Sequence, residues 1–322
     1  MLPTEDEPPM HQRPSRRRLV CSRHAFLLLL ALLAVHPRVG AQDRTIDLAG
    51  RSTAVWEPTV AANHRGPSPV LIFSHGFGGC ATGVSYLMKA LAERGYWVFA
   101  PQHRDGSCTR RAPGRPEEPF RDADQWSDHT YSERRDDILA LEGALKLDKR
   151  YAPKLDFSRL GYLGHSLGGY TVMGLAGAWP SWVSAPKPRA VLAMSPYIQP
   201  YLASSTLGRV DVPVMLQGGT QDLGITPSLT RQGGAYDMLQ APKYLVVFTG
   251  ARHLSWGNAG SARIHDVIVG SAIAFLDHYV RGRSAAASLT TVGAGVASMQ
   301  FESELGTSTD APASPRSVRR RT

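Results

Sequence analysis

The chain has 322 residues, 43% of them hydrophobic and 20% charged, which is enough to bury the core of one large domain. Its formal net charge is +9, but the range 42–303 holds 26 basic and 22 acidic residues, a net charge of only +4. Such a mixed surface argues against a site for a polyanion, so we expect no nucleic acid partner.

Residues 1–41 have the pattern of a secretory signal peptide. Basic residues precede an apolar run from Ala25 to Val35, and the small residues Val39 and Ala41 mark a place where a signal peptidase could cut. The run is shorter than the ~20 apolar residues that span a bilayer, and no other segment is apolar enough to do so. We therefore predict an exported protein, periplasmic or secreted, without stable membrane insertion once the signal peptide is removed.

From residue 42 onward, short apolar runs alternate with helical patterns. The runs do not alternate polar and apolar residues, which is typical of strands buried on both faces of a parallel sheet. The predicted strands are 69–73, 96–100, 160–163, 190–194, 213–216 and 244–248. The predicted helices are 84–94, 132–147, 169–178, 227–239 and 262–280. This order predicts an α/β fold: a doubly wound, mostly parallel sheet of about eight strands with helices on both faces.

The segments outside this alternation complete the predicted organisation. TIDLAG and STAVWEPTV, ahead of the first buried strand, predict an antiparallel hairpin at one edge of the sheet. We assign residues 42–283 to a single domain and 284–322 to a partly disordered C-terminal extension, whose early part, 289–301, could still add a strand. The connection between residues 102 and 132 has no periodic pattern, and a loop of this length in a compact domain is more often functional than idle.

Ser166 stands in the stretch GHSLGG, between the predicted strand LGYL and the helical pattern GGYTVMGLAG. This is the context that a G-x-S-x-G nucleophile elbow requires. Glycine two positions before and two after the serine permits a turn so sharp that larger side chains would collide there. We predict that Ser166 is a nucleophile; the alternative is a glycine-rich turn whose serine only caps the helix.

A serine nucleophile needs a base, and the base needs a third group that holds it in one tautomer. In α/β folds with this elbow the partners follow in the order serine, acid, histidine, each just past a later strand. Asp222 follows the strand PVML in QGGTQD, and His253 follows YLVVF in TGARH. We assign them as acid and base, and we give His165 and His75, which adjoin the site, structural roles.

Acyl transfer also requires donors for the developing oxyanion. The backbone N–H of Leu167 supplies one, and we assign the second to Phe77 in the glycine-rich turn FSHGFGG. Alternatively, HGFGG is only a flexible turn. Trp126, Tyr197 and Trp256 come from loops at the same rim and, with Phe77, are predicted to line a substrate pocket, although aromatic residues serve equally often in packing.

The SHGFGG turn, the stretch YWVFAPQHRDGS and the long loop that leads to RRDDI and GHSLGG resemble the platelet-activating factor acetylhydrolase group. The resemblance extends to the predicted dienelactone hydrolases and cutinase-like serine esterases of the α/β-hydrolase superfamily, and it covers about residues 50–280. It implies a serine esterase, often of short or oxidised acyl chains, with no metal or other cofactor. In it, Ser166 is the nucleophile, His253 the base, and Phe77 and Leu167 the oxyanion donors.

The acid departs from the acetylhydrolase pattern. The acetylhydrolases place theirs after the sixth strand, where this chain has MSPYIQP, whereas Asp222 matches the position used by bacterial cutinases and most dienelactone hydrolases. The resemblance therefore does not fix a phospholipid-like substrate. Dienelactone hydrolases proper use a cysteine nucleophile, which Ser166 excludes.

Beyond the signal peptide, the chain holds two cysteines, Cys80 and Cys108. An even count in an exported protein favours a disulfide, although two separate thiols remain the alternative. In the fold implied by the resemblance, both cysteines emerge at the same rim, so a bond between them would close a 28-residue loop and brace one wall of the pocket.

The predicted function is hydrolysis of a small-molecule or lipid-like carboxylic ester through an acyl-Ser166 intermediate. A second possibility is a cutinase-like polyester or lipid hydrolase, which would need a shallow, open groove. A third is a non-catalytic binding protein on the same fold.

Overall fold

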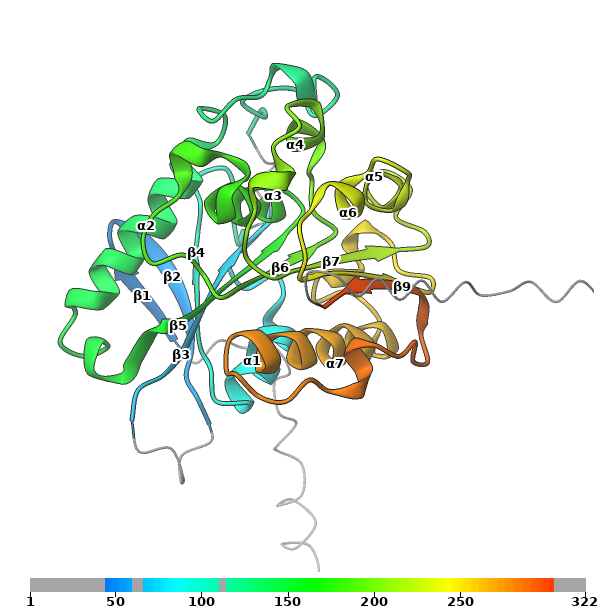
Figure 1. The fold of residues 1–322 in the computed structure, drawn as a ribbon. Helices are drawn as coiled ribbons and strands as arrows, with labels where there is room; N and C mark the ends of the chain where they lie inside the picture. The colour runs from blue at the N-terminus through cyan, green and yellow to red at the C-terminus, as the bar shows by residue number, and fades with distance from the viewer. Residues whose placement is uncertain (1–43, 60–65, 110–113, 304–322) are drawn as a thin grey trace, which may run out of the picture. The chain divides into compact units, whose positions relative to one another are not determined.

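The computed structural model describes residues 44–59, 66–109 and 114–303 (Figure 1). All of them belong to one compact unit, residues 39–322. The predicted signal peptide and the last part of the predicted C-terminal extension, residues 304–322, lie outside the described residues.

The described residues form a nine-stranded sheet in the order β1-β2-β4-β3-β5-β6-β7-β8-β9. The six strands from β4 to β8 in this order are parallel, while the β1-β2 hairpin at one edge and β9 at the other are antiparallel. The strands are β1 (Arg44–Leu48), β2 (Arg51–Trp56), β3 (Ser68–Ser74), β4 (Trp97–Pro101), β5 (Leu155–His165), β6 (Ala190–Met194), β7 (Val214–Gly219), β8 (Lys243–Phe248) and β9 (Val296–Glu302). The predicted fold class and edge hairpin are confirmed.

Helices cover both faces of the sheet (Figure 1). They are α1 (Ser85–Glu93), α2 (Ser132–Leu147), α3 (Leu167–Met173), α4 (Gln199–Ala203), α5 (Thr226–Thr230), α6 (Ala235–Met238) and α7 (Ala262–Tyr279). Side chains of α1 and α7 share one apolar cluster with the sheet, whereas those of α2 and α3 share another on the opposite face. The apolar runs of the inner strands follow from this, because both faces of each strand are buried.

Two predicted helices differ from the structure. The pattern over 227–239 forms two short helices, α5 and α6, because Gly233 between them has a φ of 68° that helical residues do not adopt. The pattern over 169–178 is α3 followed by a wider turn at 174–178, where Gly177 has a φ of 129°. The strand β9, within the predicted extension, pairs with β8.

The parallel strands end at a common rim, and this edge carries the polar side chains of interest. Ser166 directly follows β5, Ser195 follows β6, Asp222 follows β7 after two intervening residues, and His253 lies beyond β8. The glycine-rich turn at 75–79 follows β3. Open α/β sheets build their sites at this edge, since the loops there come from several strands at once.

Candidate active site

The turn at Ser166 has no space for side chains on the glycines that flank the serine. Ser166 has φ 55° and ψ −118°, a conformation that a residue with a side chain rarely adopts and that costs about 1–3 kcal/mol. A Cβ atom on Gly164 would lie 2.1 Å from the carbonyl oxygen of Gly168, and one on Gly168 would lie 1.9 Å from that of Ser74. Both glycines are therefore required for the turn, which holds the serine at the end of β5.

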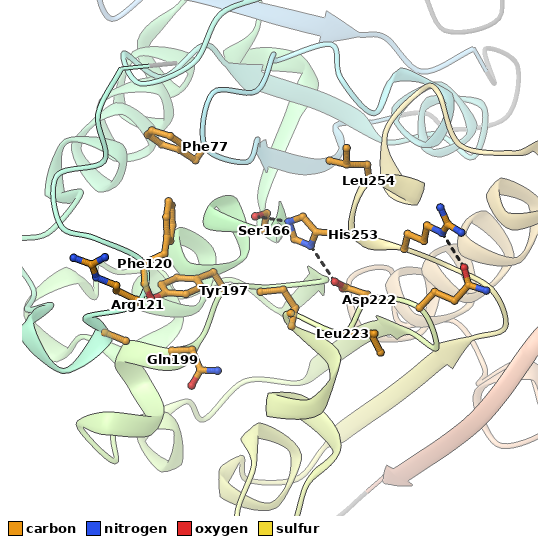
Figure 2. A pocket seen from close by; sticks show the side chains of 15 residues that line it. Phe77, Phe120, Arg121, Ser166, Tyr197, Gln199, Asp222, Leu223, His253 and Leu254 are labelled. Carbon is orange, nitrogen blue, oxygen red and sulfur yellow. Dashed lines mark hydrogen bonds and ion pairs between the residues drawn. The ribbon is translucent and has the colours of Figure 1, made fainter. Parts of the chain in front are cut away.

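Ser166, His253 and Asp222 meet at the rim, as Figure 2 shows. The Oγ atom of Ser166 lies 2.9 Å from Nε2 of His253, a normal hydrogen-bond distance. On the other side of the ring, Nδ1 of His253 lies 3.4 Å from Oδ1 of Asp222, whose side chain is only 2% exposed. The structure thus brings together three side chains that the sequence separates by up to 87 positions.

A fourth side chain, Ser195, enters the same cluster and was not among the predicted site residues. Its Oγ atom lies 2.7 Å from Nδ1 of His253 and donates a hydrogen bond to Oδ2 of Asp222. Ser195 is fully buried. Its position directly after the predicted strand 190–194 is the one signal in the sequence that could have drawn attention to it.

His165 contacts the backbone of His253. Its Nε2 atom lies 3.0 Å from the backbone carbonyl oxygen of His253, and the two imidazole rings lie 5.1 Å apart between centroids. Burial lowers the pKa of His165 to about 4, so the ring is neutral at pH 7 and donates this hydrogen bond without adding charge beside His253.

The turn after β3 lies against the elbow. A Cβ atom on Gly76 would be 3.2 Å from Cβ of Ser166, a tighter contact than most Cβ atoms make, so the turn lies close against the serine. No hydrogen bond among the described backbone groups uses the N–H of Phe77 or of Leu167. Among the described residues, both N–H groups therefore lack a backbone acceptor.

A buried arginine fixes this turn. Arg134 on α2 is fully buried and donates from Nη1 to the carbonyl oxygen of His75 at 2.7 Å. Its Nη2 atom donates to Oδ2 of Asp105 at 2.8 Å, and the carbonyl oxygen of Asp105 accepts from the N–H of Gly78 at 3.1 Å. One guanidinium thus connects both ends of the turn to the loop that follows β4.

Two buried histidines continue the same network. Nδ1 of His75 donates to the carbonyl oxygen of Gly76 at 2.8 Å, and its Nε2 accepts from the N–H of His103 at 3.0 Å. His103 lies 2.8 Å from Asp137 through Nδ1. Burial is the main cause that holds the pKa of both histidines well below 6.5, so both rings are neutral at pH 7.

Cys80 and Cys108 form a disulfide with a Cα–Cα distance of 4.6 Å. The bond joins the end of the turn after β3 to the loop after β4, next to a backbone hydrogen bond of 2.7 Å from Ser107 to Gly79. The predicted disulfide is present, and it is consistent with an exported protein.

A cavity of about 980 Å³ opens over Ser166 and His253 (Figure 2). Phe77, Phe120 and Tyr197 form part of its wall; Phe120 comes from the long loop between β4 and α2. Leucines stand elsewhere on the wall: Leu223 is 78% exposed and Leu254 is 75% exposed. Phe120, Leu223 and Leu254 were not predicted, because loops give no apolar periodicity, whether long, as around Phe120, or short, as after β7 and β8.

The structure differs from the prediction for two tryptophans. Trp126 is 4% exposed and packs behind the cavity wall, with its ring centroid 5.6 Å from that of Phe120 and 4.9 Å from that of Tyr197. Trp256 is fully buried, and its indole N–H donates to Gln217 at 3.0 Å. Neither lines the cavity, because the core on each side of the sheet has enclosed these large side chains.

The described residues offer neither a metal site nor a membrane-spanning helix. Across 44–59, 66–109 and 114–303, no three His, Cys, Asp or Glu side chains are grouped so that they could hold a metal ion. In the same ranges, no helix has both the length and the hydropathy to cross a membrane.

A family model described as "Platelet-activating factor acetylhydrolase, isoform II" matches residues 49–126. The chain has the α/β-hydrolase fold, and it is similar to these acetylhydrolases. The matched segment runs from β2 through the turn after β3 to Trp126, so it contains the Phe77 turn but ends before Ser166. No curated protein matches the chain. The match supports an esterase-type hydrolase in general.

Proposed function

We propose that the protein is a serine hydrolase that cleaves carboxylic esters through an acyl-Ser166 intermediate. The observation that carries the proposal is the 2.9 Å contact between Oγ of Ser166 and Nε2 of His253, with the carboxylate of Asp222 behind the ring. A hydroxyl in this position loses its proton to the imidazole as it attacks a carbonyl carbon.

The reaction proceeds in two halves. In the first, His253 takes the proton of Ser166, Oγ bonds to the acyl carbon, and the imidazolium returns the proton to the departing alcohol oxygen as its bond to carbon breaks. In the second, His253 takes a proton from water, the hydroxide adds to the acyl carbon, and the proton returns to Ser166 as the free acid leaves. Asp222 holds the imidazole in the required orientation and stabilises its charged form.

The N–H groups of Phe77 and Leu167 act as the oxyanion donors. Leu167 directly follows Ser166, and Phe77 follows Gly76, which lies against Ser166; neither N–H has a hydrogen-bond acceptor among the described residues. Their alignment is fixed before the substrate arrives, because the elbow and the Arg134 network hold the two backbone segments. Pre-aligned donors of this kind contribute most to the stabilisation of a tetrahedral intermediate.

The cavity indicates the class of ester. Its wall is rich in aromatic and aliphatic side chains, and Arg121 and Arg252 are its cationic residues. We propose a small-molecule or lipid-like ester with an apolar part as substrate. The long loop between β4 and α2 adds Phe120 and Arg121 to the wall of the site, and a wall built by such a loop favours this substrate over the extended surface of a polyester.

Turnover of p-nitrophenyl esters by the wild type and by Ser166→Ala tests the proposal. We expect Ser166→Ala to lower kcat by about 10⁵- to 10⁶-fold, while Ser158→Ala, at an exposed serine on β5, leaves it unchanged. A fluorophosphonate should label wild-type Ser166, identified by peptide mass spectrometry, and should not label the Ser166→Ala protein. Equal turnover by the wild type and Ser166→Ala would instead support the alternative that the chain is a non-catalytic binding protein on the same fold.

A further inference from the structure

We propose that Ser195 is a positioning residue that relays the hydrogen bond between Asp222 and His253. The inference rests on the proposed function, because a relay to the base matters only if His253 transfers protons. It concerns a side chain that touches neither Ser166 nor the cavity.

The distances favour a connection through the Ser195 hydroxyl over a direct one. Nδ1 of His253 lies 2.7 Å from Oγ of Ser195, within the usual range for a hydrogen bond, but 3.4 Å from Oδ1 of Asp222. The Ser195 hydroxyl contacts the other oxygen of that carboxylate. The shortest hydrogen-bonded path from the ring to the acid therefore passes through Ser195.

Donor counting assigns the direction of each hydrogen bond. An ionised carboxylate only accepts, so the single hydroxyl proton of Ser195 points to Asp222. The oxygen of Ser195 must then accept from His253, which places a proton on Nδ1. A neutral imidazole protonated on Nδ1 has a free lone pair on Nε2, the atom that faces Ser166 at 2.9 Å. Ser195 thus selects the tautomer that a general base requires.

The backbone at Ser195 directs its hydroxyl into the cluster. Ser195 has a φ of 41°, a left-handed conformation that is uncommon outside glycine, and its N–H donates to the carbonyl oxygen of Gln217 at 2.7 Å. This hydrogen bond uses the backbone of Gln217, whereas Trp256 bonds to its side chain at 3.0 Å. A strained serine in a fully buried position is expected where its side chain has a specific task.

Ser195→Gly is the most direct test. Glycine accepts a φ of 41° without strain, so this variant removes the hydroxyl and leaves the backbone conformation easier to adopt. We expect kcat for p-nitrophenyl acetate to fall about 10- to 100-fold, the effect of one lost hydrogen bond to a charged group, with KM changed less than about twofold. A kcat within about twofold of the wild type would overturn the proposal.

Ser271→Ala is the matched control. Ser271 is also a buried serine, and its hydroxyl bonds to Gln217, but it does not contact the imidazole. A structural hydrogen bond alone predicts similar losses of melting temperature and activity in the two variants. The relay predicts a loss of kcat only for Ser195→Gly.

Proton NMR gives a readout that does not depend on a variant. In the wild type we expect a far-downfield Nδ1 proton of His253 with a nuclear Overhauser effect to the β protons of Ser195. Absence of that effect in a spectrum that shows the Nδ1 proton would also overturn the relay, even if Ser195→Gly failed to fold. Fluorophosphonate labelling of Ser166 separates the two proposals: labelling with an unchanged kcat in Ser195→Gly rejects only the relay.

Discussion

The two sides of the site differ in how firmly they are held. The turn after β3, residues 75–80, is fixed by the buried guanidinium of Arg134, by the His75–His103 contacts and by the disulfide at Cys80. The opposite side, residues 221–225 with 252–254, projects Leu223 and Leu254 into the open. At the surface, the side chain of Arg252 donates a hydrogen bond of 2.8 Å to that of Gln221 and so joins these two segments.

This difference agrees with the two roles that the proposed ester hydrolysis would give to these sides. Oxyanion donors act by being aligned before the reaction, and any reorganisation during the reaction reduces their effect. Apolar walls act by removing water from substrate groups, which does not depend on a single geometry. The buried charge of Arg134 and the disulfide at Cys80 suit the alignment of oxyanion donors, whereas the exposed leucines suit an apolar wall.

The largest expected effect comes from breaking the buried ion pair on the fixed side. Arg134→Met leaves the carboxylate of Asp105, 11% exposed, without its partner, which costs about 3–5 kcal/mol of unfolding free energy. Urea denaturation measures it. Arg135→Met on the same helix is the control, because its pair with the exposed Asp136 contributes less than about 1 kcal/mol. Equal stability of the two variants would contradict the role assigned to Arg134.

Removal of the disulfide is expected to have the next largest effect. The bond closes a loop over 28 positions, and the loss of that constraint on the unfolded chain corresponds to about 3–4 kcal/mol. The double variant Cys80→Ser, Cys108→Ser should melt at a lower temperature, and a reductant should lower the melting temperature of the wild type but not of the variant. Two titratable thiols in the native wild type, with an unchanged melt, would contradict this.

Acid should weaken the protein through its buried histidines. Burial lowers the pKa values of His75, His103 and His165 in the folded state, while the unfolded chain binds protons near the ordinary value of 6.5. Stability is therefore complete above about pH 6.5 and falls as the pH drops toward 4, the approximate folded pKa of His165.

Denaturant titrations between pH 7.5 and 4 measure this loss of stability. His165→Gln removes one titrating group, so the slope of unfolding free energy against pH should decrease in that variant. His129→Gln, at a histidine 93% exposed, should leave the slope unchanged. An identical slope in the wild type and His165→Gln would show that His165 does not titrate as described.

The parts of the molecule that could be predicted from the sequence are those with a local pattern. The six inner strands were predictable because their residues are apolar on both faces. The turn at Ser166 was predictable because it contains two glycines at positions where a larger residue would collide with the backbone. The positions of Asp222 and His253 at the same rim were predictable because each follows such a strand. In these cases a local pattern reflects a local steric or packing requirement.

Ser195 and Arg134 illustrate the residues that could not be predicted. A serine after a strand is common, and only the three-dimensional arrangement places its hydroxyl between two side chains 27 and 58 positions away. Arg134 is fully buried in the structure, but an arginine on a helix is normally predicted to be exposed, since arginine is rarely fully buried. Trp126 and Trp256 were expected in the cavity wall because they come from loops near the rim. Their large apolar side chains are instead buried in the core.

The smallest expected effect concerns the open side and separates substrate contact from stability. Leu223→Ser and Leu254→Ser remove exposed apolar surface from the cavity wall, so KM for p-nitrophenyl esters of long acyl chains should rise about 2- to 10-fold, while KM for the acetate stays nearly constant. Melting temperatures should not change, because neither side chain is in the core. Leu147→Ser is the matched control, since this leucine is 84% exposed at the end of α2, outside the cavity lining. If all three variants act alike on long esters, the leucines at the rim do not contact the acyl chain, and Phe77, Phe120 and Tyr197 would have to supply the apolar contact instead.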